Sequence, residues 1–216
     1  MSGGSARGYD RLARVYAGLE RLAFGDLLLQ ARTCLLAETK TPSRVLIVGE
    51  GDGRTLQRVL EQFPNARIDC LEQSPEMIRK ARERVDSAKV RWLQQNIITF
   101  EPEPAGYDLI VTTFILDSFT GEVLAGLMRK LAMGLKLGGQ WYYADFYVPE
   151  QGWGRARAQT WLTLMYTFFR VFTKLGVSGL EPPDKHFETL GLTLTDERFL
   201  SNELLVARLY TWSQRS

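Results

Sequence analysis

The feature that most constrains this chain is a turn with three alternating glycines, Gly49-Glu50-Gly51-Asp52-Gly53. The turn follows Val45–Val48, an apolar run with the length and composition of a buried parallel strand. The apolar residues after the turn have helical spacing: Leu56, Val59, Leu60 and Phe63. Glycine lets the backbone take positive φ and approach a ligand closely. This order of strand, glycine turn and helix predicts a ligand crevice at the end of a parallel strand.

Predicted strands and helices alternate along most of the chain. Beyond the first strand, at residues 44–48, strands are expected over residues 67–71, 90–93, 107–112 and 140–144, the last after a turn at Gly138-Gly139. Helices are expected over residues 9–22, 26–37, 75–85, 122–133 and 155–175. Two β-rich runs, residues 192–199 and 204–210, predict a closing antiparallel hairpin. The pattern predicts an α/β fold, a doubly wound and mostly parallel seven-stranded sheet with helices on both faces.

Composition narrows the class of protein further. The 216 residues suffice for one well-cored domain, and a formal charge of +2 without a basic block argues against nucleic acid as a partner. Cys34 and Cys70 lie far apart, which favours two reduced thiols over a disulfide, and no metal site is expected. No secretion signal or apolar run of about 20 residues is found, so a cytoplasmic protein without a transmembrane segment is expected.

A carboxylate follows the second predicted strand. Glu72 ends that strand, where an acid can accept hydrogen bonds from both hydroxyls of a ribose. Nicotinamide and flavin dinucleotides favour GxGxxG, but here Arg54 occupies the third glycine's place and the glycine comes one residue earlier. A nicotinamide-dependent oxidoreductase is therefore the disfavoured alternative.

The motifs together resemble those of class I S-adenosylmethionine-dependent methyltransferases, nearest the small-molecule branch. Residues 45–53 resemble the first motif and residues 71–77 the second, while residues 90–97, 107–114 and 137–140 resemble the later strand motifs. The resemblance implies S-adenosyl-L-methionine as cofactor and S-adenosyl-L-homocysteine as product. It implies an unidentified small-molecule acceptor. A catalytically idle cofactor-binding module of the same fold remains an alternative.

The resemblance also implies which residues hold the cofactor. Glu72 would hold the ribose and the glycine backbone would pass the methionine part, while other residues would line the adenine and the methyl donor. The implied cofactor-binding set is Tyr9, Tyr16, Gly49, Glu50, Gly51, Gly53, Glu72, Gln73, Met77, Asn96, Ile97, Thr113 and Phe114. Ile47 stands where the family commonly has an acid. Glu50 either replaces that charge near the cofactor's amino group or is merely exposed.

The N-terminal residues resemble the tyrosine-bearing lid of small-molecule methyltransferases. Tyr9 and Tyr16 lie two turns apart on one face of the predicted helix. Residues 1–40 are therefore expected to form a helical lid, and residues 41–216 the methyltransferase domain, within one domain overall. Simple aromatic packing of the helix is the alternative.

Catalytic candidates are few, because alignment supplies much of the rate of methyl transfer from a sulfonium. Asp117 and Asp145 follow predicted strands at the crevice edge, and His186 lies in a predicted loop; each is a candidate base. The aromatic residues 155–175 have three interpretations: a buried helix or homodimer face, an apolar wall for an aromatic acceptor, or transient contact with a membrane surface.

Overall fold

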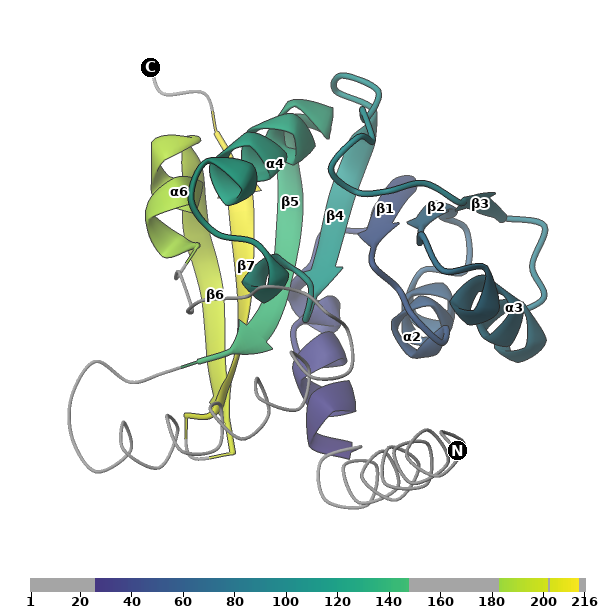
Figure 1. Cartoon of the computed structure of the whole chain (residues 1–216). Coiled ribbons are helices and arrows are strands. Elements are labelled where there is room, and N and C mark those ends of the chain that lie inside the picture. Colours follow the sequence, from purple (N-terminus) through teal and green to yellow (C-terminus); the bar gives the residue numbers. More distant parts are fainter. Residues whose placement is uncertain (1–25, 148–182, 202, 214–216) are drawn as a thin grey trace, which may run out of the picture.

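The structure, a computed structural model, describes residues 26–147, 183–201 and 203–213 (Figure 1). Within these residues seven strands form one sheet in the order β3-β2-β1-β4-β5-β7-β6. The parallel strands are β1 (Arg44–Val48), β2 (Arg67–Leu71), β3 (Val90–Leu93), β4 (Tyr107–Thr113) and β5 (Leu135–Phe146). β7 (Leu205–Trp212) pairs antiparallel with both β5 and β6 (Leu192–Leu200). The predicted α/β sheet and its closing hairpin are confirmed.

Apolar side chains alternate between the two faces of the sheet, and each face has its own core. On one face Ile47, Val111 and Tyr142 pack against the helix at residues 26–33, η1 (Leu36–Glu38) and α2 (Arg54–Gln62). On the other, Val48, Ile110 and Trp141 pack against α4 (Gly121–Gly134) and α6 (Asp184–Thr189). Figure 1 shows α4 and α6 together on this second face. A sheet covered on both faces explains why the central strand β1 is apolar from Val45 to Val48.

The start of α3 (Pro75–Arg84) follows from its sequence. Ser74 precedes the helix, and its Oγ accepts a hydrogen bond from the backbone N–H of Met77 at 3.3 Å. Pro75 takes the first helical position, where its missing N–H costs no hydrogen bond. This predicted helix start is confirmed, and it fixes the direction in which the chain leaves β2.

Three sequence predictions about the elements were wrong in detail. β5 begins at Leu135 rather than after Gly138-Gly139, because the glycines lie in an irregularity where the register shifts between Tyr107 and Leu109 of β4. His186 lies in α6 rather than in a loop, since buried Phe187 anchors this short helix to the sheet. The helix predicted over residues 26–37 is interrupted after residue 33 and resumes as η1.

Other predictions concern parts that are only partly described. The helices predicted over residues 9–22 and 155–175 lie outside the described residues, as do residues 1–25 of the predicted lid over residues 1–40. Both cysteines are free thiols, and Cys70 is buried as expected. Within the described residues, no helix has the length and apolar character to cross a membrane, and no cluster of side chains is suited to a metal ion.

Candidate cofactor site

The glycine turn leaves the carboxyl end of β1 and passes directly into α2. Gly51 and Gly53 have φ of 71° and 91°, in the region that favours glycine. A Cβ on Gly53 would lie 2.8 Å from the Cα of Ala81, so α3 packs directly on the turn. A Cβ on Gly51 would meet no atom within 4 Å. The backbone of Gly51 is therefore open to a ligand, whereas Gly53 is required for packing.

Glu72 joins the end of β2 to this turn. Its Oε2 accepts a hydrogen bond from the Gly51 N–H at 3.0 Å, and its Oε1 accepts one from the Ser74 N–H at 2.8 Å. The Gly49 N–H also donates to the Leu71 carbonyl at 2.8 Å. The structure thus brings together the turn and the acid that the sequence predicts to share a ligand. A half-buried carboxylate beside open glycine backbone fits a ligand with neighbouring hydroxyls.

Glu50 lies inside the turn but faces α2. The side chain is 2% exposed, and its two oxygens accept hydrogen bonds from the N–H groups of Thr55 and Leu56 at 2.9 and 3.0 Å. Gly53 at the N-cap has no side chain, so Glu50 performs the capping that an N-cap side chain usually provides. The interpretation of Glu50 as an exposed glutamate was wrong. Its contact with the cofactor stays a prediction.

Opposing effects act on the charge of Glu50. Burial raises the pKa of its carboxyl to about 7, while Arg32 and the two helix N–H groups lower it. Ile47, at the family's acidic position, is 1% exposed within the apolar core. The carboxylate of this chain therefore stands at the start of α2 rather than inside β1.

Arg32 reaches the site from the helix at residues 26–33, and sequence analysis missed it. Its Nη1 donates to Thr55 Oγ1 at 3.1 Å and to Thr113 Oγ1 at 3.2 Å. Its guanidinium lies over the ring of Phe114, 4.9 Å from the centroid. One feature of the sequence could have identified Arg32: it lies one turn from the apolar Leu28 and Leu35, beside the buried face of its helix.

Thr113 and Phe114, both predicted to face the methyl donor, lie where β4 ends. Thr113 is 3% exposed, and Phe114 has a φ of 57°, a left-handed conformation that few side chains adopt. The Phe114 N–H donates to the Ala144 carbonyl at 2.8 Å, and its ring meets that of Phe146 edge-on. The strained backbone at this point redirects the chain away from β4 at the edge where the glycine turn also lies.

The residues predicted to line the adenine lie at the ends of β2 and β3. Gln73 is exposed, and Met77 is half-buried in the first turn of α3. Asn96 is exposed and its Oδ1 accepts from the Ile98 N–H at 2.8 Å, while Ile97 packs against the α4-side core. Their contact with a cofactor stays a prediction. Tyr9 and Tyr16 lie outside the described residues.

Two of the three catalytic candidates lie together. Asp117, in η2 (Leu116–Ser118), donates its backbone N–H to Asp145 Oδ2 at 3.3 Å, and Asp145 Oδ1 accepts from the Phe146 N–H at 2.9 Å. Asp145 is 1% exposed; burial, and then the charge of Asp117, raise the pKa of its carboxyl well above the usual value. His186 lies on α6. A catalytic role for any of the three stays a prediction.

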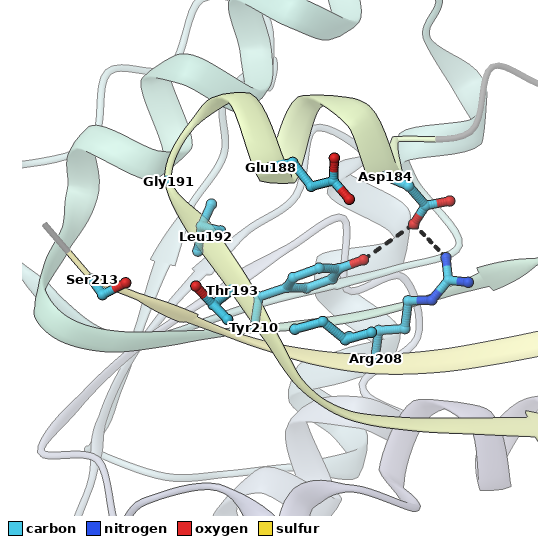
Figure 2. A pocket seen from close by; sticks show the side chains of 9 residues that line it. Asp184, Glu188, Gly191, Leu192, Thr193, Arg208, Tyr210 and Ser213 are labelled. Carbon is cyan, nitrogen blue, oxygen red and sulfur yellow. Dashed lines mark hydrogen bonds and ion pairs between the residues drawn. The ribbon is translucent and has the colours of Figure 1, made fainter. Parts of the chain in front are cut away.

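A cavity of about 540 Å³ lies between α6 and the β6–β7 hairpin (Figure 2). Figure 2 shows Asp184 between Arg208, with which it forms an ion pair, and the hydroxyl of Tyr210, which donates to it at 3.1 Å. The cavity extends to Leu192 and Ser213, near the end of the sheet opposite the glycine turn. It is therefore separate from the candidate cofactor site.

Comparisons with known proteins agree with this geometry. A family model described as a methyltransferase domain matches residues 45–139. Malonyl-[acyl-carrier protein] O-methyltransferase 1 of Ilyobacter polytropus is 37% identical over 109 residues, which cover 50% of this chain and 40% of that protein. Demethylmenaquinone methyltransferase of Thermus thermophilus is 27% identical over 150 residues, 67% of this chain and 66% of that protein.

A solved structure extends the likeness to nearly the whole fold. It is the 1,6-didemethyltoxoflavin-N1-methyltransferase of Burkholderia thailandensis with bound S-adenosylhomocysteine, at a TM-score of 0.64 and 14% identity, covering 99% of this chain and 93% of its own. The chain spans about half the length of the curated relatives it matches first. The matched methyltransferase domain, these relatives and the shared fold together support a class I S-adenosylmethionine-dependent methyltransferase.

Proposed function

We propose that this chain binds S-adenosylmethionine at the glycine turn and transfers its methyl group to a small-molecule acceptor. One observation carries the proposal: Glu72 Oε2 lies 3.0 Å from the Gly51 nitrogen, beside backbone that a ligand can approach. Glu72 would accept hydrogen bonds from the ribose hydroxyls, and the glycine turn would pass the methionine part. Relatives named for methylation of small molecules support an acceptor of that class.

The bound sulfonium supplies an activated methyl group, so the task of this chain is alignment. The end of β4, with Thr113 and Phe114, stands beside the turn and would border the methyl donor. An acceptor that loses a proton needs a base near this edge. Asp145 and Asp117 are the candidates there.

Calorimetric titration with S-adenosylhomocysteine tests the cofactor half of the proposal. Glu72→Gln should weaken binding by about 10- to 100-fold, because hydrogen bonds to a charged group contribute about 1.5–3 kcal/mol. Glu61→Gln, the same change on the exposed side of α2, should leave binding unchanged. Failure of the unaltered protein to bind S-adenosylhomocysteine, together with stabilisation by NADH, would overturn the proposal.

The idle-module alternative rests on Ile47, which leaves β1 without the acid common in the family. An idle module would bind S-adenosylhomocysteine but transfer no methyl group to any acceptor. A radiolabelled methyl donor incubated with quinol, carboxylic acid and amine acceptors separates the two functions. Labelled product with any acceptor class excludes the idle module.

A further inference from the structure

We infer that the cavity between α6 and the β6–β7 hairpin is an accessory binding site for a small organic amine in its ammonium form. The inference concerns a place separate from the candidate cofactor site, so it does not depend on the proposed function. The cavity has a volume of about 540 Å³, within the range of about 300–1,000 Å³ of small-molecule sites. Its described lining comes from α6, from both strands of the hairpin and from residues that flank them (Figure 2).

The polar side chains that line the cavity are mainly hydrogen-bond acceptors. Asp184 and Glu188 lie one helical turn apart on α6, and Figure 2 shows both on the side of the helix that faces Tyr210. The hydroxyls of Thr193 and Ser213 can also accept hydrogen bonds. Burial, and then the charge of Asp184, raise the pKa of Tyr210, whose phenol donates its proton to Asp184 at 3.1 Å. The lining therefore suits a ligand that supplies N–H donors.

The one cation among the described lining residues is already engaged. Arg208 donates from Nε to Glu197 Oε2 at 2.5 Å, and its Nη1 forms an ion pair with Asp184. This single positive charge, on a side chain 10% exposed, thus faces two carboxylates, and Glu188 adds a further acid to the lining. Lys185 is on the same helix but does not line the cavity. Because acids outnumber the cation here, the surroundings favour a positively charged ligand over an anion.

The arrangement of these acids favours an organic cation over a metal ion. Within the described part of the chain, no three side chains of His, Cys, Asp or Glu gather closely enough to hold a metal. Leu192 and Leu194 of β6 also line the cavity, and Leu194 is 44% exposed. An alkylammonium ion matches both features, because its N–H groups form charge-assisted hydrogen bonds with carboxylates and its carbon chain can contact the leucines.

Backbone amide chemical shifts, recorded by NMR while putrescine is added to the complete chain, test the inference. Putrescine is a flexible diamine, and salt at about 0.15 M screens weak attraction to the general surface. The amides of Gly191, Thr193 and Ser213 should shift, while that of Gly51 at the candidate cofactor site should not. Glu188→Gln, a change of similar size at an exposed position, should weaken this binding about 10-fold, because a charged hydrogen-bond acceptor is lost.

Matched probes and a control variant make the outcome decisive. Butanediol, the uncharged counterpart of putrescine, and inorganic phosphate should leave the cavity amides unshifted up to about 10 mM. Glu61→Gln, on the exposed side of α2, should leave the affinity for putrescine unchanged. The inference would be overturned by absence of cavity shifts with putrescine up to about 10 mM, or by equal affinity in Glu188→Gln. A stronger response to Mg²⁺ or to phosphate than to putrescine would also overturn it, because the site would then select another class of ligand.

Discussion

Replacing Glu50 with glutamine should change how the stability of this protein depends on pH. Burial raises the pKa of the Glu50 carboxyl from 4.5 to about 7. In the unfolded chain the carboxyl titrates near its ordinary value. Between these two pKa values the native state therefore holds a proton that the unfolded state has lost. The free energy of unfolding of the unaltered protein should fall as pH rises through this window.

The size of the effect follows from the two pKa values. At about 1.36 kcal/mol per pKa unit, the span from 4.5 to about 7 corresponds to about 3 kcal/mol. Glutamine does not titrate, so Glu50→Gln removes this contribution. Its amide nitrogen meets one of the α2 N–H donors, which adds a cost that does not vary with pH. The quantity to measure is therefore how the difference in unfolding free energy between the two proteins changes with pH. The contributions of the other titrating groups cancel in this difference.

Urea unfolding followed by tryptophan fluorescence at pH values from 4.5 to 8.5 measures this difference. The advantage of the unaltered protein over Glu50→Gln should shrink by about 3 kcal/mol up to pH 7 and then level off. Glu61→Gln, on the exposed side of α2, serves as the pH-independent control. A difference that stays flat or grows with pH would show that Arg32 and the helix N–H groups outweigh burial, which would refute the reasoning.

Two further predictions concern stability. Gly53→Ala should lower the free energy of unfolding by about 2–4 kcal/mol, because its Cβ would lie 2.8 Å from the Ala81 Cα at a φ of 91°. A Cβ on Gly51 meets open space, so Gly51→Ala should lower the free energy of unfolding by only about 1 kcal/mol in the same urea experiment. Equal losses for the two variants would contradict the packing argument. Arg208→Met should lower the free energy of unfolding by about 2 kcal/mol. The loss is smaller than for a fully buried ion pair, because the side chains of its partners Glu197 and Asp184 are 31% and 37% exposed. An unchanged urea midpoint would show that these ion pairs do not contribute to stability.

The elements predicted best from sequence are those whose signals are local. The Ser74-Pro75 start of α3 depends on adjacent residues, and the apolar run of β1 shows a strand buried on both faces. The start of β5 was mistaken, because only its pairing with β4 shows that Gly138 and Gly139 lie within an irregular strand. A register shift of this kind depends on contacts between distant residues, and no local pattern encodes it.

The residues of the candidate site also divide into those that the sequence predicts and those that depend on contacts between distant residues. The link between Gly51 and Glu72 was predictable from strand order alone, because both follow adjacent parallel strands. The burial of Glu50 was not, since a glutamate between glycines has the composition of a solvent-exposed turn. Arg32 was not predicted, because helical periodicity identifies apolar positions and because its partner Thr113 is 81 residues away in sequence.

The departure from the family at Ile47 and the position of Arg32 have one electrostatic explanation. An apolar residue at position 47 extends the core of β1, and the carboxylate of Glu50 stands three residues later at the positive end of α2. There the carboxylate accepts hydrogen bonds from two N–H groups of the first helical turn. The N-cap residue, Gly53, has no side chain that could accept them. Its negative charge also stabilises Arg32 without forming an ion pair with it. The acid that the family commonly has inside β1 is therefore replaced, in this chain, by one that caps the helix after the glycine turn.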